Sequence, residues 1–441
     1  MKKKNIPPPH GRAIIMYGRS MMSLVAAHSL GKKGIDVIGC DEVDLTVMSF
    51  SRYVTKTFVH PPIESNTKAF IDFMLKQIQK FAPDNDIPYV LMPIFRETEL
   101  ISEYRSVFEP YIKVAAPDYL TLQQVHPKDN LFHTAELLGL HIPPTIQPNN
   151  EAELQQILRH IEFPALVKPV NQVGGRGIIK TQNPQELISA YKKSVNRYKS
   201  APLIQGYIDG DDYCLTVLYD NGVRKASMAY RNIHRFPAES GAGSMRETVA
   251  DAPFLATADT LLHNLKWHGI VQLDFRWDKK QPPCLIEVNP RFWAGLFQSV
   301  ASGIDFPFAL FQMTANGKAP QPNQAAIGKK TKIPGLWLLG AIHSIANSEE
   351  DYIRLRDEWS NVQNKIRHKE IRDAFKLLQE SIDQRFNIKK TITELRKIVA
   401  EGRTAQNDIF FRDDPFVVLG VLFILTSLIR HRKIPPEVLH R

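Results

Sequence analysis

The sequence predicts an α/β and α+β protein, with a parallel-sheet domain first, a mixed domain next and a mainly helical region last. Short apolar runs alternate with helix-like stretches over residues 11–117, whereas residues 118–335 read mostly as strands joined by turns. Alternating strands and helices favour a parallel sheet, and hairpin-linked strands favour antiparallel pairing. Residues 1–10 are predicted to form a basic, proline-rich arm.

The parallel-sheet prediction rests on four apolar runs: "RAIIMYG", "IDVIGC", "PYVLMP" and "IKVAA". Helical patterns lie between them at residues 20–33 and 66–81. The first turn, "MYGRSMMSL", lacks the full G-x-G-x-x-G fingerprint, so a dinucleotide site is poorly supported.

The second domain opens with a helical pattern from Thr121 to Leu138, which "GLHIPPT" ends. Strand patterns follow in "PALVKPV", "GIIKT", "APLIQGYI", "YCLTVLYDNGVRKASMAYR", "IVQLDFRW" and "CLIEVN". The "DNG" of Asp220 to Gly222 is a strong hairpin turn signal. Antiparallel strands with a few helices therefore suggest an α+β domain.

Composition limits the partners. The chain has 441 residues and a formal net charge of +10, which favours anionic partners such as a nucleotide, an acidic lipid surface or a nucleic acid. Its three cysteines, Cys40, Cys214 and Cys284, are far apart, so neither a disulfide framework nor a zinc site is indicated. We expect a reducing, cytoplasmic compartment.

A metal site is predicted where "LIEVNPRFWAG" follows "GIVQLDFRW". Alternating residues of a strand share a face, so Glu287, Asn289 and Arg291 are expected to line up. If the hairpin is symmetric about Lys280 and Gln281, Asp274 lies opposite Glu287. Two close carboxylates repel each other unless a cation lies between them. Asp274, Glu287 and Asn289 are thus candidate ligands for one or two Mg²⁺ ions, with an exposed polar hairpin face as the alternative.

A phosphate-binding loop is suggested by "PALVKPVNQVGGRGI", in which Lys168 ends a strand. Gly174, Gly175 and Gly177 permit close approach of backbone N–H groups to an anion, and Arg176 contacts either phosphate or solvent. The pattern is not a P-loop, because no G-K-[ST] closes it.

A nucleotide-base linker is suggested by "LIQGYIDGDDY". Main-chain groups of Gln205, Gly206, Tyr207 and Ile208 could bond an adenine edge, and Asp212 could accept from ribose hydroxyls. Two strands joined by a simple turn is the alternative.

An acceptor pocket is suggested by "AYRNIHRFPAESGAGSMRET". We expect Arg231, Arg235 and Arg246 to bind a substrate carboxylate there. A mobile, solvated loop explains the stretch almost as well.

Residues 345–441 read as a charged, mainly helical region that contains an apolar helix at 415–429. That helix is shorter than the roughly 17–25 residues of a membrane span. A buried or docked helix is the first interpretation. Contact of residues 415–433 with an anionic membrane surface, peripheral at its inner face, is the alternative, because Arg430, Arg432 and Lys433 follow.

Taken in order, these motifs resemble the ATP-grasp superfamily over residues 115–320, and "EVNPR" is most similar to its carbamoyl-phosphate-synthase-like and biotin-carboxylase-like branch. Residues 11–117 resemble the α/β domain that precedes the ATP-grasp fold. The resemblance makes Lys128 and Lys168 the two ATP lysines, Gly174 to Gly177 the phosphate-covering loop and Arg291 the catalytic arginine. It also implies the adenine, ribose and metal roles proposed above. Gln205, Asp212 and Asp274 stand where the family commonly has Glu.

The resemblance implies an ATP-dependent carboxylate-amine ligase that uses an acyl phosphate and one or two Mg²⁺ ions, with Mn²⁺ as a substitute. The expected partners are a small-molecule carboxylate and an amine, with no nucleic acid; a homo-oligomer is compatible. Alternatives are a carbamoyl- or carboxy-phosphate enzyme and a non-catalytic ATP-binding, membrane-docking protein.

Overall fold

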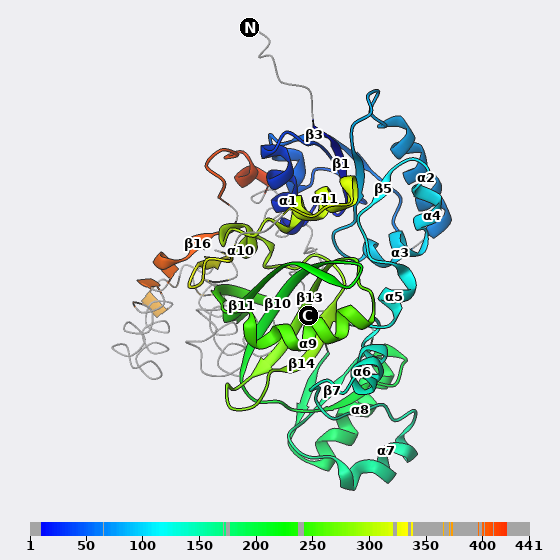
Figure 1. Cartoon of the computed structure of the whole chain (residues 1–441). Helices are drawn as coiled ribbons and strands as arrows, with labels where there is room; N and C mark the ends of the chain where they lie inside the picture. The colour runs from blue at the N-terminus through cyan, green and yellow to red at the C-terminus, as the bar shows by residue number, and fades with distance from the viewer. Residues whose placement is uncertain are drawn as a thin grey trace. The chain divides into compact units, whose positions relative to one another are not determined.

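The computed structural model describes residues 10–64, 66–170, 172, 177–236, 242–320, 324–333, 402–408 and 410–420, together with 337, 365, 370, 372–373, 396 and 399–400 (Figure 1). The chain divides into two compact units. The first unit is Met1–Asn232, Glu247–Lys329 and Ile409–Arg441, and the second is Ile233–Arg246 and Lys330–Asp408. Most of the predicted helical region at 345–441 and all of 421–441 lie outside the described residues.

The first unit begins with a parallel sheet of strand order β3-β2-β1-β4-β5. Its strands are β1 (Arg12–Ile15), β2 (Asp36–Asp41), β3 (Val54–Val59), β4 (Tyr89–Met92) and β5 (Lys113–Val114). The prediction of a parallel sheet is confirmed, although β3 was missed. β3 is an edge strand whose side chains are mostly exposed, so "VTKTFV" lacks the apolar run of its neighbours.

Two helices of this sheet begin at side-chain caps. Ser20 accepts a hydrogen bond from the backbone N–H of Met22 at the start of α1 (Met21–Lys32). Asn66 accepts one from Ala69 at the start of α2 (Thr67–Lys80). Such caps satisfy N–H groups that the first turn of a helix leaves unpaired. The observed bounds confirm the helices predicted at 20–33 and 66–81 to within a residue at each end.

Short helices lie between the strands of this sheet and between it and the next sheet. They are η1 (Val47–Phe50), α3 (Glu97–Glu103), α4 (Arg105–Phe108), α5 (Tyr119–Gln123) and α6 (Lys128–Leu137). The continuous helix predicted from Thr121 to Leu138 is wrong, because Pro127 separates α5 from α6. Proline has no N–H to continue a helix but is suited to a helix start, and here it places Lys128 in the first turn of α6.

The second sheet is small and antiparallel, with the order β6-β9-β7-β8. Its elements are β6 (Thr145–Ile146), α7 (Glu151–Ile157), η2 (Leu158–His160), β7 (Ala165–Lys168), β8 (Ile179–Thr181), α8 (Pro184–Tyr198) and β9 (Leu203–Gly206). Leu154 of α7 and Leu187 of α8 pack with Val167 and Ile204 in one core cluster. Figure 1 shows this part in cyan-green, with α7 and α8 beside β7.

A third sheet presents the strand order β14-β13-β10-β11 in the first unit. Its strands are β10 (Asp211–Asp220), β11 (Val223–Phe236), β13 (Gly269–Trp277) and β14 (Cys284–Asn289). The predicted "DNG" hairpin is confirmed, since Asp220 pairs with Val223 and both Asn221 and Gly222 have positive φ. That conformation is what a two-residue primed turn requires.

Alternation along this sheet separates an apolar face from a polar one. Leu273 and Phe275 of β13 pack with Phe254 and Leu261 of α9 (Ala252–Asn264). Figure 1 shows α9 lying across this face. The intervening residues of β13, which include Asp274, therefore face the other side of the sheet.

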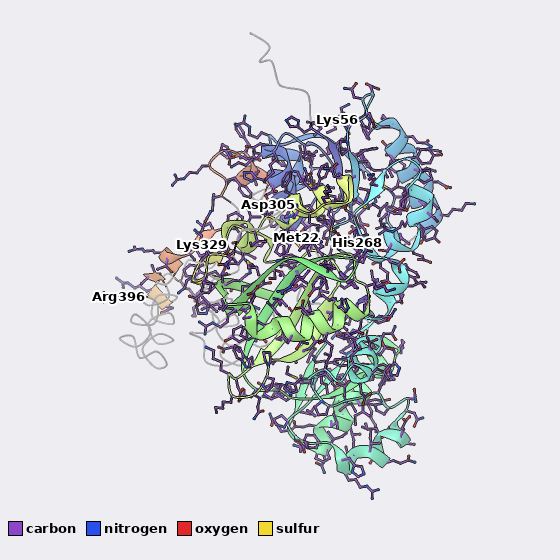
Figure 2. All side chains as sticks on the ribbon, viewed as in Figure 1. Met22, Lys56, His268, Asp305, Lys329 and Arg396 are labelled. Atoms are coloured by element: carbon purple, nitrogen blue, oxygen red, sulfur yellow. The ribbon has the colours of Figure 1, made fainter. Side chains whose placement is uncertain are left out.

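The helices after β14 pack on the N-terminal sheet. They are α10 (Leu296–Ala301) and α11 (Phe306–Asn316). Asp305 caps α11 and also binds Ser29 of α1 and Lys33, the residue that follows α1. Figure 2 labels Asp305 near Met22, at the start of α1. The buried Trp293 belongs to the same core as residues of α1 and α11.

The second unit contains β15 (Lys330–Lys332), which lies between β12 (Ala242–Val249) and β16 (Gln406–Asn407). Arg246 of β12 is 1% exposed, and its Nη1 lies 2.7 Å from the Oδ2 of Asp408. Two charges removed from water in this way must be paired. Among the described residues, no helix combines the length and the apolar character that a membrane crossing needs.

Candidate functional site

Two carboxylates face each other across β13 and β14, as predicted: Asp274 is the register partner of Glu287. The hairpin is nevertheless not symmetric about Lys280 and Gln281, because Arg276 pairs with Cys284. A bulge between Asp274 and Phe275 absorbs one extra residue of β14 and restores the Asp274–Glu287 pairing. Bulges of this kind re-aim side chains.

The bulge also explains which side chains of β14 are buried. Leu285 and Val288 belong to the same apolar core although they are three residues apart. Strict alternation would place them on opposite faces, and the extra residue at Ile286 removes that conflict. Glu287 and Asn289 are thereby left for the polar side of the sheet.

Asp274 is held by two amide side chains. Its Oδ1 accepts from Gln272 Nε2 at 2.9 Å, and its Oδ2 accepts from Asn289 Nδ2 at 3.1 Å. Gln272 also donates to the hydroxyl of Tyr230 at 3.1 Å. Both donors are neutral amides, and they fix the orientation of the Asp274 carboxylate.

Glu287 pairs with the first predicted ATP lysine. Lys128 Nζ lies 3.3 Å from Glu287 Oε1 and donates to the carbonyl of Gln172 at 2.6 Å. Burial acts to raise the pKa of Glu287, but the charges of Lys128, Lys168 and Arg291 outweigh it and lower that pKa. Glu287 is therefore ionised at neutral pH, as a metal ligand must be.

Lys168, the second predicted lysine, ends β7 and is buried. Its Nζ donates to Oε1 of Gln205, whose Nε2 in turn donates to Thr145 Oγ1 at 3.0 Å. Burial, followed by the like charge of Lys128, lowers the pKa of Lys168 to about 8. An ammonium with a neutral partner in a buried place would gain from an anionic ligand.

Arg291 lies directly beyond β14 and bends back toward Asn289. Its Nη2 donates to Asn289 Oδ1 and its Nη1 to the carbonyl of Phe292, each at 2.9 Å. Its guanidinium also lies 4.4 Å from the ring centroid of Phe95. Stacking and two hydrogen bonds fix the plane of the guanidinium, which suits recognition of a phosphate or carboxylate.

The predicted ribose acid is ion-paired. Asp212 of β10 is opposite Arg276 of β13, and Arg276 Nε lies 2.8 Å from Asp212 Oδ1. The same guanidinium donates to the carbonyl of Gly210 at 2.7 Å and lies 6.0 Å from the Tyr207 ring. Arg276 thus orients Asp212 next to the predicted adenine linker.

The predicted linker itself, Gln205 to Ile208, spans the end of β9. The backbone N–H of Gly206 donates to Pro144 at 2.8 Å and that of Tyr207 to Pro164 at 3.1 Å. Lys180 Nζ lies 3.6 Å from the centroid of the Tyr207 ring. These two N–H groups are occupied, so a base would have to contact other groups of the linker, such as its carbonyls or the ring of Tyr207.

Part of the predicted phosphate loop lies outside the described residues, namely Gly174, Gly175 and Arg176. Gly177 is described and has a φ of 75°, where a side chain would also meet the Tyr198 ring. Only glycine fits such a backbone position easily.

The three arginines predicted to bind substrate lie on strands, and the loop interpretation of their segment is wrong for the described residues. Arg231 and Arg235 belong to β11 and Arg246 to β12. Arg231 pairs with Asp211 at 3.3 Å and Glu247 at 3.2 Å. The burial of Arg246 against Asp408 gives no support to a substrate contact.

Sequence reasoning missed Arg276 and His126. Arg276 is two residues from Asp274, and the same alternation that selected Glu287 and Asn289 would have selected it. His126 lies 3.7 Å from Glu99, and burial lowers its pKa despite the nearby charges of Glu99 and Glu287. No sequence pattern singled out His126, because Glu99 belongs to the N-terminal sheet domain.

The donor set fits Mg²⁺. Two carboxylates and an amide supply hard oxygens, which this ion prefers. Asn289 Oδ1 already accepts from Arg291, so it would have to share its second lone pair. Among the described residues, no group of three or more His, Cys, Asp and Glu is placed to hold a metal ion.

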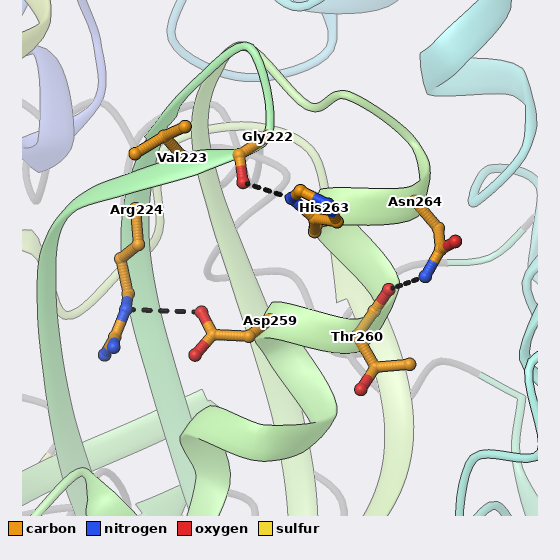
Figure 3. Close-up of a pocket in the computed structure, with 7 residues that line it drawn as sticks. All are labelled: Gly222, Val223, Arg224, Asp259, Thr260, His263 and Asn264. Atoms are coloured by element: carbon orange, nitrogen blue, oxygen red, sulfur yellow. Dashed lines mark hydrogen bonds and ion pairs between the residues drawn. The ribbon is translucent and has the colours of Figure 1, made fainter.

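A separate open pocket of about 650 Å³ lies between the β10–β11 hairpin and α9 (Figure 3). Arg224 and Asp259 form an ion pair across it at 3.3 Å. It is lined by Gly222, Val223, Arg224, Asp259, Thr260, His263 and Asn264. None of these is a predicted site residue, and the pocket lies on the α9 side of the sheet, whereas Asp274 faces the other side.

Comparison with known proteins finds one matching family model and several similar folds. Residues 199–333 match a family model described as ATP-grasp in the biosynthetic pathway with Ter operon. The fold is similar to the biotin carboxylase–βγ-ATP complex from Campylobacter jejuni, with a TM-score of 0.59, 16% identity and coverage of 72% of this chain and 74% of that one. It is also similar to the ADP complex of N5-carboxyaminoimidazole synthetase from Staphylococcus aureus, with a TM-score of 0.57, 16% identity and coverage of 74% and 82%.

A third similar structure is the L-amino acid ligase from Bacillus licheniformis, with a TM-score of 0.54, 17% identity and coverage of 70% and 75%. At such identities the likeness concerns the fold. The matched family segment contains β10, β13 and β14, the strands that carry Asp212, Asp274 and Glu287. An ATP-grasp family model thus matches residues 199–333, and the fold of the chain is similar to the folds of these three enzymes.

Proposed function

We propose that the chain is an ATP-dependent ligase that joins a carboxylate to an amine through an acyl phosphate and releases ADP and phosphate. The observation that carries the proposal is the meeting of Lys128 with Glu287, 3.3 Å apart and opposite Asp274. Cations for a polyphosphate and oxygens for a metal converge there from α6, β13 and β14.

In the first step a carboxylate oxygen of the substrate attacks the γ-phosphorus of ATP. The bond from that phosphorus to the β,γ-bridging oxygen breaks, and ADP leaves. Two anions must approach each other, so the barrier depends on neutralising their charge. Lys128, Lys168 and Arg291 supply fixed positive charge for this purpose.

In the second step the nitrogen of the amine attacks the acyl carbon. The bond from carbon to the phosphate oxygen breaks, inorganic phosphate leaves, and the nitrogen loses a proton. Arg291 is the best-placed group to orient the transferring phosphate, because Phe95 and Phe292 hold its guanidinium. Fixed donors of this kind need no reorganisation during the reaction.

Asp274, Glu287 and Asn289 would hold Mg²⁺, or Mn²⁺ in its place, which when bound neutralises phosphate charge. Asp212, oriented by Arg276, would accept from the ribose hydroxyls. The solved complexes with βγ-ATP and ADP on this fold support a nucleotide as ligand.

We further propose that residues 11–117 and residues 118–335 form two domains. A cytoplasmic location stays a prediction.

The proposal is tested with purified full-length protein, ATP and Mg²⁺ in a metabolite extract, with products identified by mass. A new product equal to an acid plus an amine minus one water, formed together with ADP and phosphate, is expected. ADP and phosphate without such an adduct, in both the presence and the absence of amines, would contradict ligation.

The same experiment addresses the alternative in which the acid is bicarbonate. ATP cleavage that requires added bicarbonate and persists without any other acid would favour carboxy-phosphate chemistry. The likeness to a biotin carboxylase fold makes this arm worth including.

A further inference from the structure

The C-terminal strap, defined as residues 410–420, is tied to the N-terminal sheet domain by two aspartates. Asp413 lies 3.0 Å from His28 Nε2 and 3.2 Å from Lys32 Nζ, and it accepts from the Tyr53 hydroxyl at 2.8 Å. Figure 1 shows the strap in orange-red, beside the blue segment that contains α1.

Asp414 is buried and accepts from the Ser51 hydroxyl and from the backbone N–H of Arg52 at 3.0 Å. Burial acts to raise the pKa of Asp413, but hydrogen bonds from His28, Tyr53 and Lys32 outweigh it and lower that pKa. Asp413 is therefore ionised, and both carboxylates are turned toward partners on the protein.

Apolar contacts reinforce this inner face. The ring of Phe411 stacks on His28 with centroids 3.9 Å apart, and its edge meets Phe297 at 5.7 Å. Val417 is fully buried, and Gly420 lies against Val47 and Phe50 of η1. The side of the strap that carries Phe411, Asp414 and Val417 therefore packs on the protein, and we call it the inner face. The side that carries the exposed residues is the outer face.

The outer face of the strap is apolar and cationic. Phe410, Phe416 and Leu419 are 53%, 65% and 51% exposed. Arg412 is exposed between them, and Arg52 is exposed on the adjacent chain. Several exposed large apolar side chains within one short segment indicate an interaction site.

The positive charge of the outer face favours an anionic partner. Asp413 and Asp414 are the sole acidic residues between positions 409 and 436, and both are used on the inner side. The chain continues as "VLFILTSLI" and then reaches Arg430, Arg432 and Lys433. Large apolar side chains among cations, with both aspartates of the strap engaged by residues of the N-terminal domain, match the boundary of an anionic lipid layer.

We infer that the outer face of the strap binds an anionic lipid surface through Phe410, Phe416 and Leu419, assisted by Arg412 and Arg52. A second copy of the chain fits this face less well. A two-fold dimer would bring the same cations together, whereas an acidic surface neutralises them. The inference does not depend on the ligase chemistry proposed above.

The test is flotation of the full-length protein with vesicles of phosphatidylglycerol and phosphatidylcholine, compared with phosphatidylcholine alone. We expect binding to the anionic vesicles only, and weaker binding in high salt. Phe416→Ser with Leu419→Ser should weaken partition by at least about tenfold, because two apolar side chains no longer leave water. Arg412→Gln should weaken it for anionic vesicles.

The matched control is Leu120→Ser with Leu137→Ser, which removes two exposed leucines of α5 and α6. The control should bind as the unchanged protein does. Equal binding to neutral vesicles, or no binding at all, would overturn the inference. So would loss of binding on deletion of residues 421–441 combined with no effect of the Phe416 and Leu419 changes. A dimer that the same two changes convert to a monomer would assign the face to self-association instead.

Discussion

Lys128 Nζ and Glu287 Oε1 lie 3.3 Å apart and join the first turn of α6 to β14. Glu287 is at the same time the register partner of Asp274. One carboxylate therefore stands between a lysine that could hold phosphate and an acid that could share a metal.

Arg291→Lys should lower kcat by about 10²–10³-fold while leaving the KM for ATP nearly unchanged. Lysine cannot reproduce both the stacking on Phe95 and the hydrogen bond to Asn289. Steady-state release of phosphate measures both constants. Arg197→Lys on α8 is a suitable control, and an equal loss in both variants would remove the special role of Arg291.

The pH dependence of kcat/KM for ATP should report Lys168, whose pKa burial lowers to about 8. The protonated ammonium is the form that binds phosphate, so kcat/KM should be highest below that pH and fall above it. Lys168→Arg keeps a positive charge and should shift this fall to higher pH, even if the rate is lower. The control is Lys192→Arg on α8. An unchanged alkaline limb in Lys168→Arg would show that another group titrates.

Asp212 should make the protein distinguish ATP from 2′-deoxy-ATP. 2′-Deoxy-ATP lacks one ribose hydroxyl, so the Asp212 carboxylate makes one hydrogen bond fewer with it. We therefore expect ATP to bind roughly tenfold more tightly. Asp212→Ala should abolish the preference by weakening only ATP. Asp209→Ala, in the exposed stretch just before β10, serves as the comparison. A preference that survives in Asp212→Ala would place the ribose elsewhere.

The Arg246–Asp408 pair should be structural. Asp408→Ala leaves a buried guanidinium unpaired and should reduce the free energy of unfolding by about 3–5 kcal/mol. Glu109→Ala breaks an exposed pair with Arg105 and should cost about 0–1 kcal/mol. Urea unfolding followed by circular dichroism compares the two. A small loss in Asp408→Ala would leave Arg246 available for a substrate role.

Local sequence patterns were sufficient to predict several elements. The helices at α1 and α2, the "DNG" hairpin and the Asp274–Glu287 pairing all follow from local patterns that the folded chain keeps. The bulge at Ile286 was not predictable, because both registers of the β13–β14 hairpin bury apolar residues and tertiary packing decides between them.

Features that depend on distant partners also escaped prediction. Edge strand β3 lacks an apolar run because one of its edges has no neighbour in the sheet. His126 gains its surroundings from Glu99 and Glu287, which belong to other elements. The burial of Arg246 depends on Asp408, far along the chain, so the sequence around Arg246 read as a substrate loop.

The central claim is that Glu287 joins a metal to the phosphates of ATP. Isothermal titration calorimetry of ATP binding, with and without Mg²⁺, tests it without relying on turnover. Wild-type protein should bind ATP more tightly with Mg²⁺, and Glu287→Gln should lose that dependence while Glu136→Gln, an exposed control on α6, keeps it. Undiminished Mg²⁺-dependent binding in Glu287→Gln would contradict the account.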